Sequence, residues 1–242
     1  MSTSAPKLSV RIVPVTPLQQ NCSLLWNEDT KHALLIDPGG DADVLMQALS
    51  QFGLALTRMW LTHGHLDHAG AAAELRERTG VAVEGPHAED QFWLDRIESD
   101  ATRYGVKGLR NVTPDRYFDD GEALDFEGAR FDVIHTPGHT PGHVVIFNRD
   151  AKLAFVGDVL FQGSIGRTDF PRGDHATLIA SITQKLWPLG EDVRFVPGHG
   201  PLSTFGQERR ANAFVADRIT GYAGAPTTEA DAVEQKLTKR WT

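Results

Sequence analysis

The sequence contains a single cysteine, Cys22, among 242 residues, so no disulfide bond can form within one chain. Such a composition is typical of a reducing compartment, and we expect a cytoplasmic protein. A lone thiol could act as a nucleophile, but the apolar stretch NCSLLW around Cys22 favours a small buried side chain.

Positive charge and long apolar runs are also scarce. The chain has 24 Lys and Arg against 32 Asp and Glu, a net charge of −8. Nucleic-acid and membrane-surface binding depend on clustered basic residues, so we expect neither. No apolar run approaches the roughly 20 residues of a membrane helix, and the start, MSTSAPKLSV, lacks the pattern of a secretory signal.

Short apolar runs rich in Val, Ile and Leu alternate with helical patterns in two approximate rounds. This order predicts two sheets packed face to face with helices outside, within one domain spanning residues 1–220. We expect the tail, 221–242, to be a short helix or partly disordered. Expected strands cover 8–15, 22–26, 32–37, 57–63, 81–85 and 193–200, and pairs of strands cover 123–136 and 144–158; expected helices cover 41–53, 68–80, 88–105, 175–190 and 205–220.

The stretch HGHLDH places four metal-binding side chains within six residues: His63, His65, Asp67 and His68. His63 and His65 are two residues apart and continue an apolar strand, so the strand period predicts that both point to one side. Asp67 and His68 follow where the chain turns into a helix. Two neighbouring subsites can therefore form, and the donor types suit zinc-like ions.

Further donors occur where other apolar strands end in glycine-containing turns. They are Asp37 in LLIDPGG, His139 and His143 in TPGHTPGH, Asp158 in FVGD, and His199 in FVPGHG. Strand ends are the usual place for a rigid scaffold to present functional groups. We therefore expect these segments to complete the site.

The remaining histidines are assigned ordinary roles. His32, His87 and His175 lie in polar or helical contexts. His135 is expected to be an inward-facing strand residue, and His143 to support the site or the fold.

Taken together, HGHLDH, TPGHTPGH, Gly157-Asp158 and the PGH at 197–199 resemble the metallo-β-lactamase-fold hydrolases. The stretches GSIGRTDFP, LWPLG and VPGHGPLSTFGQER are similar to the short bacterial type of glyoxalase II, the hydroxyacylglutathione hydrolases. The 43 residues after His199 fit that short type. The resemblance implies an α+β fold, a four-layer αββα sandwich with the metal site at one edge of the two sheets.

The resemblance also implies a set of metal ligands. Asp37 would accept a bond from a ligand imidazole and fix its tautomer. Asp67 and Asp158 would be the catalytic carboxylates, with Asp158 bridging two divalent ions. The first ion would be held by His63, His65 and His139, and the second by Asp67, His68 and His199.

The implied reaction is hydrolysis of a small-molecule thioester, S-lactoylglutathione, to lactate and glutathione by a hydroxide that bridges the two metals. Zinc is the expected metal, and the donor types also suit iron and manganese. No protein nucleophile is required, and Ser164 is assigned a structural role. Arg167 in GRTDF could grip a glutathione carboxylate through a bidentate fork, or could pair internally with Asp169 or Asp174.

Other functions remain open at this point. One is a sulfur dioxygenase acting on glutathione persulfide with a single iron. Another is hydrolysis of a different ester, lactone or phosphodiester on the same fold. A third is an electron-transfer module. HGHLDH, in place of the HCHADH associated with the dioxygenases, favours the hydrolase. The oligomeric state is left open.

Overall fold

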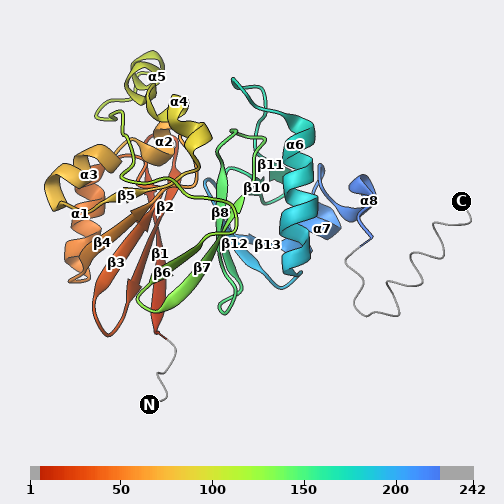
Figure 1. Cartoon of the computed structure of the whole chain (residues 1–242), viewed down its shortest axis with the longest axis horizontal. Helices are drawn as coiled ribbons and strands as arrows, with labels where there is room; N and C mark the ends of the chain where they lie inside the picture. The colour runs from red at the N-terminus through yellow and green to blue at the C-terminus, as the bar shows by residue number, and fades with distance from the viewer. Residues whose placement is uncertain (1–5, 224–242) are drawn as a thin grey trace, which may run out of the picture.

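Two β-sheets lie face to face, each covered by helices on its outer side, in the computed structural model of the chain (Figure 1). The structure describes residues 6–223, so most of the predicted tail, 221–242, lies outside the described residues. The predicted α+β, four-layer αββα sandwich is confirmed.

The first sheet is mixed. Its β1–β2 and β2–β3 pairs are antiparallel, whereas β3, β4 and β5 run parallel. Its strands, in spatial order, are β1 (Leu8–Val15), β2 (Gln20–Asn27), β3 (His32–Ile36), β4 (Ala55–Trp60) and β5 (Val83–Glu84). The accompanying helices are α1 (Ala42–Gln51), α2 (Leu66–Ala69), α3 (Ala72–Thr79), a 3₁₀ turn (Ala88–Asp90), α4 (Gln91–Leu94) and α5 (Ile97–Tyr104).

The second sheet is antiparallel except where β12 and β9 run parallel. Its strands, in spatial order, are β13 (Ser203–Thr204), β12 (Arg194–Pro197), β9 (Leu153–Gly157), β8 (Val144–Asn148), β7 (Ala129–His135) and β6 (Ala123–Phe126). A small ribbon is formed by β10 (Leu160–Phe161) and β11 (Ser164–Ile165). The helices here are α6 (His175–Ala180), a π-helical continuation (Ser181–Leu186), a 3₁₀ turn (Trp187–Leu189), α7 (Phe205–Ala211) and α8 (Asp217–Thr220).

An apolar layer between the sheets forms the floor beneath the site. Leu34 and Trp60 from the first sheet pack with Phe131 and Phe155 from the second, and all four are almost fully buried. The rings of Trp60 and Phe131 meet edge to face at 5.4 Å. Burying side chains of this size contributes about 1.5–3 kcal/mol each, so the strand ends above them are held by a rigid core.

Three helices predicted as continuous are broken. The helix expected over 68–80 is interrupted at residues 70–71, between α2 and α3. The helix expected over 88–105 is divided into a 3₁₀ turn, α4 and α5, and the helix expected over 205–220 into α7 and α8. At the break between α7 and α8 the buried amide of Asn212 donates to the carbonyl of Ser164, and its oxygen accepts from the amide of Phe214. Such side-chain bonds compete with the helical pattern and end α7.

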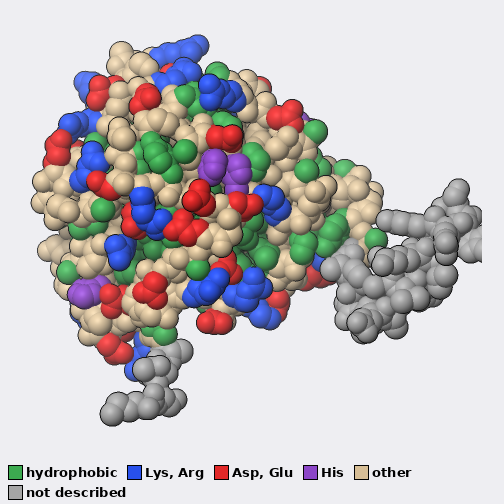
Figure 2. Space-filling view, viewed as in Figure 1, with side chains coloured by type: hydrophobic (Ala, Val, Ile, Leu, Met, Phe, Trp, Pro, Cys, Tyr) green, Lys and Arg blue, Asp and Glu red, His purple; other side chains and the backbone are tan. Residues whose placement is uncertain are grey.

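Basic and acidic side chains are interspersed over the face shown in Figure 2. Ion pairs at the surface include Arg110 with Glu77 and Arg116 with Glu122. Within residues 6–223, no helix has the length and apolar character required to cross a membrane.

Candidate metal centre

The predicted donors meet at one edge of the sandwich because strands of each sheet end there. β3 and β4 are parallel, so the segments carrying Asp37 and His63 leave the same edge of the first sheet. β9 and β12 are parallel too, which places Asp158 and His199 at one edge of the second sheet. Outside the carboxyl ends of parallel strands, side chains from distant segments can converge.

His63, His65 and His139 form the first donor group. His65 Nδ1 lies 3.1 Å from His63 Nε2 and 3.0 Å from His139 Nε2. Ligands at about 2.0–2.2 Å from one zinc-like cation have donor atoms spaced in this way. The three side chains are buried, and they come from loops after β4 and β7.

Asp67, His68 and His199 form the second donor group. Asp67 Oδ2 is 3.2 Å from His199 Nε2 and 4.0 Å from His68 Nε2. Asp67 and His68 lie on the single turn of α2, whereas His199 follows β12. The backbone amide of Asn21 donates to the carbonyl of Gly198 at 2.7 Å, which ties the His199 loop to the first sheet.

Asp158 lies between the two groups. Its Oδ2 is 3.7 Å from His139 Nε2 in the first group and 3.7 Å from His199 Nε2 in the second, while Oδ1 is 3.3 Å from His68 Nε2. This placement is suited to a carboxylate that bridges two cations.

Hydrogen bonds to the ring nitrogen that faces away from the centre orient several of the imidazoles. His139 Nδ1 donates to the carbonyl of Arg167 at 2.7 Å, and His199 Nδ1 donates to that of Leu18 at 3.2 Å. Each of these bonds fixes the tautomer and leaves the Nε2 lone pair facing the centre, as metal binding requires.

Asp37 and Thr62 supply the same support to His68 and His63. Asp37 Oδ2 accepts from His68 Nδ1 at 2.9 Å and from the Thr62 hydroxyl at 2.6 Å. The hydroxyl in turn lies 3.1 Å from His63 Nδ1, and Asp37 Oδ1 accepts from the Thr62 amide at 2.7 Å. Asp37 is therefore within reach of the ligands, while its oxygens are engaged in holding them.

Three buried carboxylates, those of Asp37, Asp67 and Asp158, lie close together in the site. Burial lowers the pKa of His63, and nearby imidazoles lower it further, which favours a neutral ring with a free lone pair. Burial alone would raise the pKa of Asp158, yet His68 and neighbouring imidazoles hold it well below its usual range. For His68, the carboxylates of Asp158, Asp37 and Asp67 outweigh burial and raise the pKa. Buried carboxylates of this kind require a cationic partner.

Two orphaned buried atoms test whether metal ions fit here. His68 Nε2 and Asp158 Oδ1 have no hydrogen-bond partner within the described chain. A buried polar atom without a partner costs about 1–3 kcal/mol. His68 Nε2 and Asp158 Oδ1 face each other across the space between the donors, so cations bound there would satisfy both. The residues therefore fit divalent cations.

The other histidines have supporting or peripheral positions. His143 stacks on His63 with ring centroids 4.7 Å apart, and its Nε2 accepts from the Asp158 amide at 3.1 Å. His135 Nε2 donates to the carbonyl of Pro141 at 2.7 Å, which holds the His139 loop. His32 pairs with Glu127, and His175 begins α6.

His87, Glu89 and His135 form another group whose donor atoms lie close together. The His87 and His135 rings stack at 4.3 Å. The bond from His135 Nε2 to Pro141 already uses the nitrogen nearest Glu89, so this group offers fewer free donors than the centre.

Arg167 lies beside the centre and makes an internal pair. Its guanidinium binds both oxygens of Asp169, at 2.7 and 2.6 Å, and stacks on the Phe170 ring at 3.9 Å. Of the two internal partners expected for it, the structure has Asp169, while Asp174 caps α6. A role of Arg167 in substrate binding stays a prediction.

No serine or cysteine is presented as a nucleophile among the residues singled out from the sequence. Cys22 is fully buried in the apolar core, as predicted, and burial raises the pKa of its thiol. Ser164 lies in β11, where its carbonyl accepts from Asn212.

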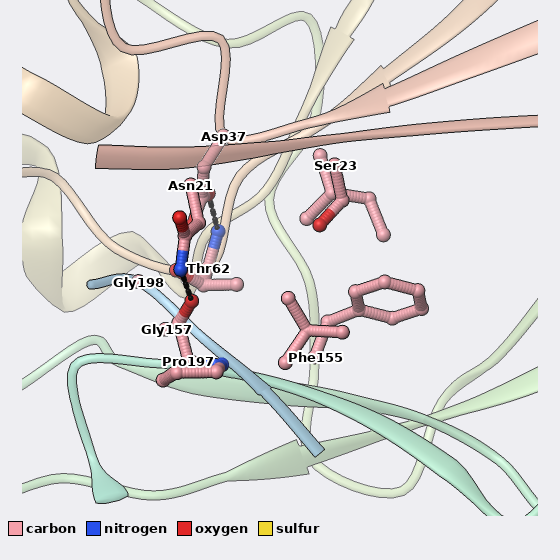
Figure 3. Close-up of a pocket in the computed structure, with 10 residues that line it drawn as sticks. Asn21, Ser23, Asp37, Thr62, Phe155, Gly157, Pro197 and Gly198 are labelled. Carbon is pink, nitrogen blue, oxygen red and sulfur yellow. Dashed lines mark hydrogen bonds between the residues drawn. The ribbon is translucent and has the colours of Figure 1, made fainter. Parts of the chain in front are cut away.

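A small cavity of about 10 Å³ lies below the site, between the sheets (Figure 3). Asn21, Ser23, Asp37 and Thr62 contribute its polar lining. Roughly 10–15 Å³ is the space of a single water molecule. The cavity is therefore too small for a substrate, which must approach the donors from the outer side.

Sequence reasoning missed Thr62, Trp93 and Asp90. Thr62 links Asp37 to His63, and the Trp93 ring contacts that of His65 at 4.5 Å. Asp90 is fully buried and bonds to the loops on both sides of the first donor group. None of them carries a signal in a single sequence, because threonine, tryptophan and aspartate are common in ordinary helices, strands and turns.

Comparisons with known proteins agree with this geometry. The family model described as "Metallo-beta-lactamase superfamily" matches residues 15–199, a range that includes every predicted ligand. The chain belongs to the metallo-beta-lactamase superfamily. The two donor clusters and this membership make the protein a metal-dependent hydrolase with a dinuclear site.

Individual relatives cover nearly all of the described chain. The chain is 48% identical over 209 residues to a protein of Haemophilus influenzae named "Hydroxyacylglutathione hydrolase GloC", covering 86% of this chain and 98% of that protein. It is 37% identical over 210 residues to the "Probable metallo-hydrolase YqgX" of Bacillus subtilis, covering 85% and 96%.

Two solved structures are also similar to this one. The structure titled "BLEG-1 B3 metallo-beta-lactamase" has a TM-score of 0.79 and 38% identity, covering 86% of this chain and 99% of that one. TTHA1623 in a di-iron-bound form has a TM-score of 0.77 and 36% identity, covering 85% and 100%. The superfamily expectation drawn from the sequence motifs is therefore confirmed.

Proposed function

We propose that the protein hydrolyses a thioester of glutathione, with S-lactoylglutathione as the first substrate to test. The observation that carries this proposal is the 48% identity to a protein named hydroxyacylglutathione hydrolase, which extends over 98% of that protein. A sulfur dioxygenase activity has no comparable support.

In this proposal His63, His65 and His139 hold one divalent cation, and Asp67, His68 and His199 hold the other. Asp158 bridges the two, which is supported by its position 3.7 Å from an imidazole of each group. Zinc suits these donors, and the di-iron form of TTHA1623 makes iron the principal alternative.

When bound, the cations would supply Lewis acidity, lowering the pKa of a water and polarising the thioester carbonyl. The residues of the chain hold the donors in place. Asp37 fixes His68, and His143 holds the Asp158 amide. The departing thiolate needs no general acid, so the absence of a free acid among the assigned residues is consistent with thioester cleavage.

In this proposal Arg167 binds a carboxylate of glutathione. It stacks on Phe170, whose ring lies 5.4 Å from that of His65, so one side chain separates the guanidinium from a proposed ligand. Its partner Asp169 is exposed, and exposed pairs contribute about 0–1 kcal/mol. A substrate carboxylate could therefore compete for the guanidinium.

Arg172 is a second cationic group near the site. Its guanidinium stacks on Phe92 at 4.2 Å, Phe92 contacts Trp93, and Trp93 contacts His65. Within residues 6–223 it has no ion-pair partner. Two arginines on aromatic rings at one side of the centre suit a peptide substrate with two carboxylates.

Metal-stripped protein provides the test of this function. Protein treated with a chelator should not release thiol from S-lactoylglutathione, and two equivalents of zinc should restore the release. The only cysteine is buried, so a thiol reagent used under native conditions reports the product. Metal-restored protein that leaves the thioester intact would contradict the proposal.

A further inference from the structure

A buried carboxylate outside the proposed ligand set joins two loops of the metal centre. Asp90 ends the 3₁₀ turn before α4 and has no exposed surface. Its Oδ2 accepts from the Gly64 amide at 2.8 Å and from the Thr140 hydroxyl at 2.7 Å. Its Oδ1 accepts from the Gly142 amide at 2.6 Å.

The three groups that donate to Asp90 belong to the two loops that carry the proposed ligands His63, His65 and His139. Gly64 separates His63 from His65, in the loop that follows a strand of the first sheet. Thr140 and Gly142 follow His139, in a loop of the second sheet. One carboxylate thus ties together the backbone on both sides of the first donor group.

Two glycines allow the Asp90 turn to approach this closely. A Cβ on Gly64 would lie 2.8 Å from Trp93 Cβ and 2.9 Å from the Asp90 carbonyl oxygen. A Cβ on Gly142 would lie 2.5 Å from the Asp90 amide nitrogen. The His87 amide adds a bond to the carbonyl of Gly142 at 3.1 Å. The turn that carries Asp90 therefore packs closely against both the Gly64 loop and the Gly142 loop.

We propose that Asp90 is a positioning residue that sets the spacing of His63, His65 and His139 by clamping their two loops together. The inference rests on the proposed function, since it concerns the ligands assigned there. Asp90 itself does not bind the metal, because its oxygens are taken up by the loop donors.

A carboxylate suits this role better than an amide. All three partners donate a proton, so each oxygen of Asp90 must accept. In Asp90→Asn, an NH₂ group would face either the Gly142 amide or the Gly64 and Thr140 donors. Either orientation would lose the bond from one loop amide, Gly142 or Gly64, while the side chain kept nearly the same volume.

The test compares Asp90→Asn with a matched control, Glu208→Gln. Glu208 is also almost fully buried and also accepts three bonds, from Gly163, Ser203 and Asn212, but none of these residues belongs to the ligand loops. Both variants should lose stability.

Zinc affinity is measured by competition with a chelator, at a temperature where both variants are folded by circular dichroism. Loss of a supporting partner of a metal ligand typically costs about 10–100-fold in affinity, and we expect this for Asp90→Asn only.

A second pair of variants keeps the inference testable if Asp90→Asn does not fold. Thr140→Val removes one of the three donors, and we expect zinc affinity to fall; Thr140→Ser retains the hydroxyl and should restore it. Equal zinc affinity in wild type, Asp90→Asn and Thr140→Val would overturn the inference. Wild-type protein that binds no zinc would instead overturn the proposed function, so the two failures are distinguishable.

Discussion

Gly198→Ala is a small change whose effect on the metal centre follows directly from the structure. A Cβ at this position would lie 2.1 Å from Asp158 Oδ1 and 2.5 Å from His68 Cε1. The loop cannot retreat easily, because the Gly198 amide donates to the Gly157 carbonyl at 2.7 Å and its own carbonyl accepts from Asn21 at 2.7 Å. The side chains of Asp158 and His68 must therefore move.

The distance that Asp158 and His68 must move sets the expected loss in kcat/KM. Restoring normal contact requires a shift of roughly 1 Å, and a misplacement of that size in an active site can cost on the order of 100-fold in rate. This corresponds to about 2.7 kcal/mol of transition-state stabilisation. We expect kcat/KM for S-lactoylglutathione to fall about 100-fold, with the fold intact.

The control is Gly200→Ala, two residues further along. A Cβ there meets nothing within 4 Å, but φ is +74°. This variant should lose about 1–2 kcal/mol of stability through backbone strain and keep its activity. The assay is kcat/KM alongside thermal unfolding. Gly198→Ala protein with full metal content and a kcat/KM within threefold of wild type would refute the reasoning.

Three further predictions address the assigned roles. Asp158→Ala should abolish hydrolysis and reduce bound metal while circular dichroism shows a folded protein; wild-type turnover with full metal content would exclude a bridging role. Arg167→Ala should raise KM more than it lowers kcat, because the ground-state contact to a glutathione carboxylate is lost; an unchanged KM would leave the guanidinium only its pair with Asp169. Alanine at His32 or His175 should leave metal content unchanged and activity within a few-fold, and a lost metal equivalent in either variant would show that the ligand set is misassigned.

The strand-end positions of the donors were predictable because apolar runs stop at recognisable glycine-containing turns. Asp37, Asp158 and His199 each follow such a run, and the structure brings them to one edge. Which strands pair in parallel is not visible in the sequence, since pairing depends on contacts between distant segments. The sequence therefore predicted that the donors would lie close together, but it did not predict the parallel strand pairs that bring them to one edge.

His63 and His65 belong to one donor group, as predicted, but strand alternation does not bring them together. β4 ends at Trp60, so the two imidazoles lie in a loop and do not follow the alternation of a strand. The Gly64 amide in that loop donates to Asp90 at 2.8 Å. Asp90 falls within a stretch predicted as continuous helix, where an acidic residue is normally exposed, so its burial could not be anticipated.

Metal dependence tested against two substrates addresses the central claim most directly. Zinc-loaded and iron-loaded protein would each receive S-lactoylglutathione and glutathione persulfide, with oxygen uptake recorded by an electrode. Thioester hydrolysis needs a Lewis acid and no redox chemistry. We predict that the zinc form releases glutathione from the thioester, with or without oxygen, and that oxygen is not consumed. Oxygen uptake on persulfide by the iron form, with no thioester cleavage by either form, would contradict it.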